Sequence, residues 1–423
     1  MDRNGGDLRQ VGRQLHRENR PRAPLAAGFP KMILAIMKNT KMGFPTILEK
    51  SAPLQIGFVP DGDCAPLAVA HESGLFEKYE LNVELRRETR LSNIRDHMIE
   101  GNLDAVHAPA TLPFITNLGI DSDRCAAVTG MVLSLQGNAI TISKHLWDEG
   151  VRDGKTLRDL IFRNWGKRTF TFGVVFPHSP AFLLLKRWLR EGCISPSEVR
   201  IVVIHTAQMF PTLKLGYIDG FCAGEPWTSL AAESGTGVCV ATSRELAPLH
   251  PEKVLMVRHD FAETRASEHE RLIAALIESC AFCDQPANRA LISEMLAQPQ
   301  YVNAPTDCLK NIVGVEDLER HPASESTPLN IFHKFNANDP TDDKAAWVLG
   351  HLYEMMEQRV LPLPPSGRAP VLKNVFRRDI FQRAKSMVFD QTQSLMAEAQ
   401  NFQANPVGAN ERFDNSVVKA IVE

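Results

Sequence analysis

Short apolar runs alternate with helix-period segments along the chain, and this pattern predicts strands that are each followed by a helix. The first unit has a strand at 54–59, a helix at 64–73, a strand at 82–86, a helix at 91–100 and a strand at 103–107. A second unit has strands at 169–176, 199–204, 218–222 and 238–241, with helices at 181–191 and 208–216. Each unit therefore predicts parallel strands joined by right-handed crossovers.

Two similar units in one chain predict two lobes. The stretch 135–142 is expected to be extended and to pass from one lobe to the other. Beyond residue 265 the pattern predicts helices at 268–287, 289–297, 343–358 and 376–384. The predicted organisation is a disordered basic tail at 1–50, lobe I at 51–137 and 243–390 with a helical C-terminal part, lobe II at 138–242, and a flexible tail at 391–423.

The composition fits a globular protein, with 44% hydrophobic and 23% charged residues. A net charge of -3 gives no reason to expect direct nucleic-acid binding. Eight scattered cysteines fit reduced thiols, and Cys280 and Cys283 fall in a predicted helix, where core packing is expected. No segment is apolar for long enough to span a membrane. Residues 1–50 are basic and their longest apolar run is Met32–Met37, so we expect a cytoplasmic protein, with the periplasm as the alternative.

In open α/β sheets, ligands bind where strands end and helices begin, because helix N-termini offer free N–H groups. A binding site is therefore expected after the strands at 54–59, 103–107, 169–176 and 218–222. Asp61 and Asp63 follow the first of these strands, and we expect them to cap the first helix.

Three motifs lie near these strand ends. They are Asp-Cys-Ala-Pro-Leu at 63–67, Leu-Gln-Gly-Asn-Ala-Ile-Thr at 135–141, and Gly-Glu-Pro-Trp at 224–227 followed by His-Pro-Glu-Lys at 250–253. Together they resemble the nitrate-binding branch of the solute-binding proteins of ABC transporters, over roughly residues 54–265. The resemblance implies an α/β, two-lobed, periplasmic-binding-protein-like (type II) fold, in which each lobe is a mainly parallel sheet flanked by helices.

The resemblance also implies a set of anion-binding residues, which in this sequence are Gln136, His178, Gly224 and Lys253. Taken singly, Gln136 and Lys253 fit surface positions, while His178 fits a helix start and Gly224 fits a turn. The family usually has a Trp at the start of the second helix, where this chain has Leu91 after Arg90. Leu91 and Arg90 are therefore predicted to form the pocket wall.

The implied residues suit a planar monoanion. Nitrate has three acceptor oxygens and nothing to donate, so its site needs only donors, and each charge-assisted hydrogen bond contributes about 1.5–3 kcal/mol. Bicarbonate has a hydroxyl group, and in the bicarbonate branch an acidic residue and a calcium ion serve it. Lys253 at that position favours nitrate or nitrite, with no metal and no cofactor.

Three functions remain open. The first is a cytoplasmic nitrate/nitrite sensor that regulates nitrate assimilation by holding an RNA-binding antiterminator protein until the anion binds. The second is the substrate-binding component of an ABC transporter for nitrate or bicarbonate, with a permease as partner. The third is an enzyme on the same fold that acts on a pyrimidine precursor. Such an enzyme needs a cysteine-rich or histidine-based centre, which the sequence lacks, so we expect no catalysis.

Overall fold

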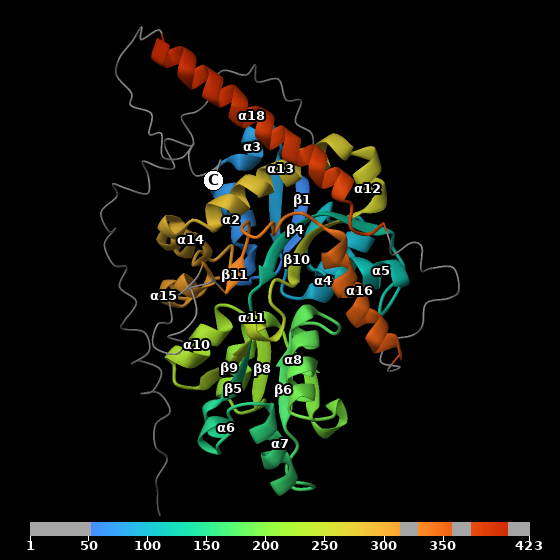
Figure 1. Cartoon of the computed structure of the whole chain (residues 1–423), viewed down its shortest axis with the longest axis vertical. Helices are drawn as coiled ribbons and strands as arrows, with labels where there is room; N and C mark the ends of the chain where they lie inside the picture. Colours follow the sequence, from blue (N-terminus) through green and yellow to red (C-terminus); the bar gives the residue numbers. More distant parts are fainter. Residues whose placement is uncertain (1–51, 314–328, 358–373, 405–423) are drawn as a thin grey trace, which may run out of the picture. The chain divides into compact units, whose positions relative to one another are not determined.

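The computed structural model describes residues 52–313, 329–357 and 374–404, all within one compact unit that spans Ile47–Glu423. The predicted tail at 1–50 lies outside the described residues. Two mixed sheets form the framework (Figure 1). The first sheet has the order β11 (Asn330–Ile331), β4 (Ala127–Gln136), β10 (Pro251–Arg258), β3 (Ala105–Pro109), β1 (Leu54–Phe58), β2 (Val83–Arg87). The second has the order β7 (Arg200–Val203), β6 (Thr171–Val174), β8 (Gly220–Gly224), β5 (Asn138–Ser143), β9 (Gly237–Thr242).

Burial along the strands follows their place in the sheets. All ten residues of β4 are buried, and so are those of β3, because both strands are internal and packed on two faces. By contrast, β2 and β7 have mostly exposed or half-buried residues, because each is an edge strand.

Helices connect the strands and pack on the sheets. Those before β10 are α2 (Ala65–Glu72), α3 (Leu75–Lys78), α4 (Leu91–Ile99), α5 (Leu112–Leu118), α6 (Lys144–Asp148), α7 (Gly154–Arg163), α8 (Pro180–Glu191), α9 (Met209–Lys214), α10 (Trp227–Glu233) and α11 (Ser243–Leu246). Those after β10 are α12 (His259–Thr264), α13 (Ala266–Cys283), α14 (Arg289–Leu296), α15 (Thr306–Leu309), α16 (Asp342–Glu357) and α18 (Arg378–Ala404). The start of α8 shows why such helices form, because Ser179 Oγ accepts the Phe182 N–H at 3.3 Å and Pro180 occupies the first turn.

The chain passes from the first sheet to the second at Gly137, between β4 and β5, and it returns between β9 and β10. Gly137 has φ +106°, and a Cβ there would collide with the Asn330 side chain, so the crossing requires glycine. The sequence predicted an extended stretch at 135–142, and β4 and β5 confirm it.

The α/β class with two sheets flanked by helices is as predicted, but two details differ. The sheets are mixed instead of mainly parallel. β1 pairs in parallel with β2 and β3, whereas β10 is antiparallel to both neighbours and β5 is antiparallel to β8 and β9. The strands next to the crossings, β10 and β5, are antiparallel to the strands of the βαβ units. Strand direction cannot be predicted from the hydrophobic pattern. In addition, α18 continues to Ala404, past the predicted tail boundary at 390, and lies along α13 (Figure 1).

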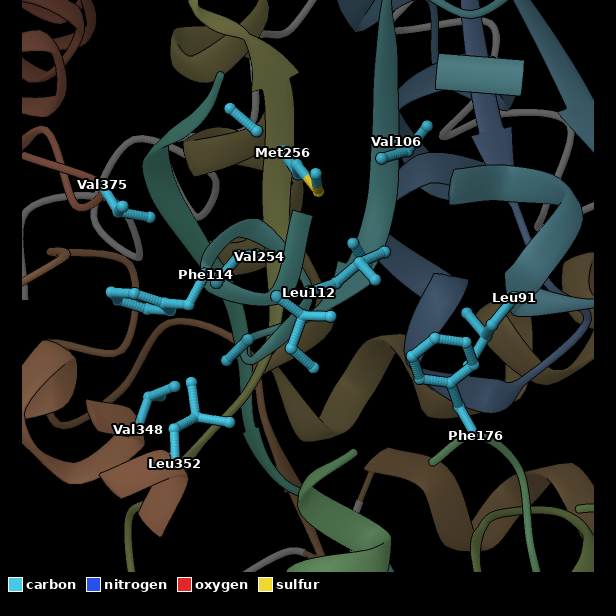
Figure 2. Packing of buried hydrophobic residues seen from close by; sticks show 14 of the residues in the cluster. Leu91, Val106, Leu112, Phe114, Phe176, Val254, Met256, Val348, Leu352 and Val375 are labelled. Atoms are coloured by element: carbon cyan, nitrogen blue, oxygen red, sulfur yellow. The ribbon is translucent and has the colours of Figure 1, made fainter. Parts of the chain in front are cut away.

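A hydrophobic cluster joins elements that are distant in sequence. Phe114 of α5, Val254 of β10 and Val348 and Leu352 of α16 belong to it (Figure 2). Phe176, which follows β6 of the second sheet, belongs to the same cluster. The cluster therefore packs the helical C-terminal part and the end of β6 against the first sheet.

Candidate functional site

The crossing segment, defined as Gln136, Gly137 and Asn138, carries the first part of the candidate site. Gln136 is 1% exposed and has φ +61°. Its Oε1 accepts the Leu249 N–H at 3.0 Å, while its Nε2 has no partner among the described residues. Because the Leu249 N–H can only donate, the amide oxygen must face it and the amide NH₂ must face away. Gln136 thus buries an unsatisfied donor, which costs about 1–3 kcal/mol unless something accepts from it.

The same segment carries a second unsatisfied donor, and a glycine packs against it. Asn138 is buried, and its Nδ2 also has no partner within the described ranges. Asn138 pairs with Gly224 in the antiparallel register of β5 and β8. A Cβ on Gly224 would lie 3.5 Å from the Gly137 carbonyl oxygen, so Gly224 lies against the crossing segment. The structure therefore brings two predicted residues, Gln136 and Gly224, to one place.

His178 lies past the end of β6, directly before the Ser179 cap of α8. Its backbone has φ +64°, which is uncommon for a side chain of this size and costs about 1–3 kcal/mol. Nε2 lies 3.4 Å from Asp121 Oδ2, and Nδ1 is buried without a partner in the described part of the chain. Burial lowers the pKa of His178, although Asp121 opposes this. A neutral ring that donates from Nε2 to Asp121 presents an acceptor at Nδ1, and protonation turns Nδ1 into a donor.

Lys253 is buried on β10 and forms an ion pair. Its Nζ donates to Asp63 Oδ2 and lies 3.7 Å from Glu252 Oε1. Burial lowers the pKa of Lys253, but the charges of Asp63, Glu252 and Asp61 outweigh burial and leave it raised. We call these four residues the carboxylate–lysine cluster. The sequence-based argument that Lys253 supplies an open positive charge to the anion therefore needs correction, because the charge is already compensated.

Asp61 and Asp63 do not cap the first helix, contrary to the sequence prediction. Asp61 Oδ1 accepts the Trp227 indole N–H at 2.9 Å, and Asp63 accepts from Lys253. Both carboxyl groups are buried, so they bond to distant side chains instead of local N–H groups. Burial, together with the charge of Asp63, raises the pKa of Asp61 to about 7.

Two buried histidines support this cluster. His107 Nε2 lies 3.1 Å from the Asp63 carbonyl oxygen, and burial lowers its pKa to about 4, so the ring is neutral and donates to that oxygen. His250 bonds to the Ala247 carbonyl oxygen through Nδ1 at 2.8 Å and to Glu252 through Nε2 at 3.1 Å.

The predicted wall residues lie at the start of α4. Leu91 is 3% exposed and packs in the hydrophobic cluster with Phe176 (Figure 2). Arg90 is exposed, and its charge is one of the causes that lower the pKa of His205, after burial. Leu91 is thus a packing residue, and a lining role for Leu91 or Arg90 stays a prediction.

Within 52–313, 329–357 and 374–404, no group of three or more His, Cys, Asp or Glu side chains is placed to hold a metal ion. All eight cysteines are free thiols, and burial raises the pKa values of Cys280 and Cys283, as expected for core thiols. No described helix combines the length and the apolar character that a bilayer crossing requires.

Residues 48–297 match the NMT1-like family. The chain belongs to this family. It is 34% identical over 381 residues to the bicarbonate transport ATP-binding protein CmpC of Synechocystis, which covers 88% of this chain and 54% of that protein. It is 37% identical over 338 residues to the nitrate import ATP-binding protein NrtC of Synechocystis, covering 78% and 49%. The chain thus spans about half the length of these curated relatives.

A shorter relative and two solved structures are also similar to this NMT1-like chain. The nitrate/nitrite binding protein NrtA of Nostoc is 26% identical over 269 residues, covering 62% of this chain and 60% of that protein. The periplasmic nitrate-binding protein NrtA of Synechocystis has a TM-score of 0.72 at 21% identity, covering 80% and 89% of the two chains. The alkanesulfonate-binding protein SsuA of Xanthomonas axonopodis has a TM-score of 0.57 at 16% identity, covering 76% and 98%. The similarity to these structures shows that the chain has the predicted α/β, periplasmic-binding-protein-like fold.

Sequence reasoning missed Asn138, although Asn138 belongs to a motif that the sequence made visible. The signal that identifies it is the unsatisfied Nδ2, which depends on what packs around the amide. The sequence also implied a single ligand set, whereas the structure gives His178 and Lys253 carboxylate partners in Asp121 and Asp63.

Proposed function

We propose that this NMT1-like chain binds a small planar oxyanion at the crossing segment, with nitrate and nitrite ahead of bicarbonate. The observation that carries the proposal is the pair of buried, unsatisfied amide donors, Gln136 Nε2 and Asn138 Nδ2, beside Gly224. An acceptor that reaches both amides would remove two desolvation costs at once. Nitrate and nitrite offer only acceptors, and a backbone without a side chain at Gly224 leaves room for close approach.

Bicarbonate is the second candidate, because buried acceptors without a partner also occur among the described residues. Asp63 Oδ1 is one of them, and Nδ1 of a neutral His178 is another. Either could accept the hydroxyl hydrogen of bicarbonate. Because the charge of Lys253 is compensated by Asp63, Lys253 no longer favours nitrate over bicarbonate. The preference for nitrate therefore rests on the amide donors.

We propose that the anion is bound for import, with an ABC permease as partner. The names of the curated relatives, which refer to nitrate import and bicarbonate transport, support this alternative. They lend no support to the sensor role, to an antiterminator partner or to a cytoplasmic location, which rest on the sequence alone. The solved relative is titled periplasmic, so the periplasm fits better as the proposed location. These relatives also support a binding protein over an enzyme.

Gln136→Glu tests the anion site. The variant keeps an oxygen to accept the Leu249 N–H but replaces the unsatisfied donor with a carboxylate oxygen that repels an anion. We expect the nitrate Kd from titration calorimetry to rise about 10- to 150-fold, which corresponds to the loss of one charge-assisted hydrogen bond. Gln300→Glu is the matched control, because Gln300 is exposed, and it should bind nitrate as the native chain does.

Titrations with nitrite, bicarbonate and an alkanesulfonate define the ligand class. A native chain that binds none of the four anions would rule out the proposal, and tighter binding of bicarbonate than of nitrate would favour the second candidate. For the role, cell fractionation with N-terminal sequencing separates importer from sensor. A periplasmic chain supports the importer, and a cytoplasmic chain in complex with an RNA-binding protein would overturn it.

A further inference from the structure

A cavity of about 300 Å³ lies between α8 and α16, away from the crossing segment. Figure 1 shows the two helices side by side, and an ion pair of 2.5 Å between Arg190 Nη1 and Glu354 Oε1 joins them. Its polar lining consists of Lys186, Arg187, Arg190, Cys193, Ser195, His351 and Glu354. Its volume is at the lower end of the range of small-molecule sites, which is about 300–1,000 Å³.

Positive charge dominates this lining. Lys186, Arg187 and Arg190 come from one side of α8, and Glu354 is the one carboxylate among the described lining residues. Arg187 pairs with Glu191 at 3.0 Å, and Glu191 does not line the cavity. Burial lowers the pKa of His351, Glu354 opposes this, and Arg190 and Arg187 add smaller contributions that lower it.

The cavity also has an apolar side, formed by Leu183, Ile194, Pro196 and Met355. A ligand that matches this lining carries acidic groups for the cations and a short hydrocarbon part for the apolar side. We propose that the cavity is a second ligand site, which binds a small organic dicarboxylate. This site is separate from the crossing segment, and its existence does not depend on the proposed function.

Each wall of the cavity is connected to predicted anion-site residues, one along the chain and the other through side-chain contacts. The residue just before the Ser179 cap of α8 is His178. On α16, Trp347 packs edge-on against His351 at 4.6 Å and stacks on His250 at 5.0 Å, and His250 bonds to Glu252 beside Lys253. A dicarboxylate that holds α8 and α16 together would therefore change the affinity for nitrate, and nitrate would change the affinity for the dicarboxylate by the same factor. This coupling step rests on the proposed function.

Titration calorimetry with glutarate on the full chain tests the site, with 1,5-pentanediol as the uncharged probe of equal length. We expect glutarate to bind with a Kd below about 1 mM and pentanediol not to bind. The double variant Lys186→Gln/Arg187→Gln should raise the glutarate Kd at least about tenfold, the effect of 1.4 kcal/mol. The control is Arg158→Gln/Arg163→Gln, which removes two exposed arginines of α7 outside the cavity and should leave the Kd unchanged.

Absence of glutarate binding to the native chain would overturn the proposal, and so would equal binding of pentanediol or an equal loss in both double variants. Thermal unfolding followed by circular dichroism shows whether each variant is folded, and nitrate titrations of the same samples accompany the glutarate titrations. They also keep the two proposals distinguishable: nitrate binding without glutarate binding removes only the second site, and glutarate binding without nitrate binding removes only the proposed function and the coupling.

Discussion

At the crossing segment, Gln136 and Asn138 each bury an amide donor that nothing in the described chain accepts. In the carboxylate–lysine cluster, a buried ammonium group meets Asp63 directly and has two further carboxyl groups nearby. The first region is incomplete without a ligand, whereas the second is compensated without one. Under the proposed function, the contrast therefore favours the neutral amide donors as the anion ligands and a structural role for Lys253, paired with Asp63.

The energetics of the two regions differ in the same way. Each unsatisfied donor of the crossing segment destabilises the ligand-free fold by about 1–3 kcal/mol, and the positive φ of Gln136 adds to this. A ligand that satisfies these groups stabilises the folded state in proportion to its concentration over Kd. Breaking the ion pair of the cluster instead leaves an uncompensated buried charge, whether or not a ligand is present.

The largest effect is expected from Lys253→Met, which removes the cation of the cluster. Asp63 would stay buried without its partner, so the free energy of unfolding should fall by about 3–5 kcal/mol in urea denaturation. Asp63→Asn with Lys253→Met should recover most of the loss. Lys144→Met breaks the exposed pair of Lys144 with Asp148 and should cost no more than about 0.5 kcal/mol.

If Lys253→Met lowered nitrate affinity instead of stability, the roles assigned to the crossing segment and to the carboxylate–lysine cluster would be reversed. The sequence implied that Lys253 holds the anion, and in that case nitrate affinity should drop by one to two decades, the loss of a charge-assisted contact of about 1.5–3 kcal/mol. A variant that keeps its stability but loses this affinity would return Lys253 to the anion site.

Asp61→Asn is expected to give the next largest effect, through its pH dependence. The pKa of Asp61 is about 7 in the folded chain and 3.8 in the unfolded reference, so folding binds a proton between these values. Native stability contributed by this group is therefore lost as pH rises from about 4 to 7. The Asn variant keeps the oxygen that accepts from Trp227 and escapes this loss, so at pH 8 it should exceed the native chain by about 2–4 kcal/mol.

The measurement is urea denaturation of both chains at several pH values from 4 to 8. The difference between them should be near zero at the acid end, grow up to about pH 7, and then level off. Asp159→Asn changes an exposed carboxyl group and should track the native chain. A constant difference between Asp61→Asn and the native chain would show that burial does not govern Asp61.

Much of the fold could be predicted because hydrophobic periodicity is local. The strands at 54–59 and 218–222 agree with β1 and β8 within two residues, and the extended crossing was expected at 135–142. β10 was not predicted although Val254–Val257 is an apolar run, because periodicity alone cannot distinguish a short buried strand from part of a buried helix. Strand direction could not be predicted, since it depends on which strands pair.

The candidate site could be predicted only in part, for a related reason. The motif containing Gln136 is visible in the sequence, and Gly224 belongs to another such motif. The charge state around Lys253 depends on Asp63, a partner 190 residues away that no local pattern identifies. For the same reason Asp61 was predicted to be a helix cap, when its partner is Trp227.

Asn138→Leu separates binding from stability at the crossing segment. Removing a buried donor that has no partner should leave the ligand-free chain unchanged or raise its free energy of unfolding by about 1 kcal/mol. Nitrate affinity should fall about tenfold or more, because one of the two open amides is lost. Asn288→Leu replaces an amide that is bonded to the Phe282 carbonyl oxygen, so it should lose stability and retain nitrate affinity. Equal losses of stability in both variants would show that the Asn138 amide has a partner.

The smallest effect is expected at His178, which the sequence predicts to bind the anion and whose protonation depends on pH. Burial holds the pKa of His178 below its usual value of 6.5, so near pH 7.5 the ring is neutral and its Nδ1 accepts when Nε2 faces Asp121. Protonation below that pKa makes Nδ1 a donor, and bound nitrate favours the protonated form. Nitrate affinity should therefore rise as pH falls from 7.5 to 5.5, by up to about tenfold.

His178→Asn provides the control, because Asn tolerates a positive φ and does not titrate. The nitrate affinity of His178→Asn should not change over the same pH range, except for any change caused by titration of the carboxylate–lysine cluster. The pH dependence of nitrate affinity in Asp61→Asn measures how much that cluster contributes. An equally steep pH dependence in His178→Asn and in the native chain would place the titrating group in the cluster. The anion would then sense the carboxylates around Lys253, and the separation between the two regions would not hold.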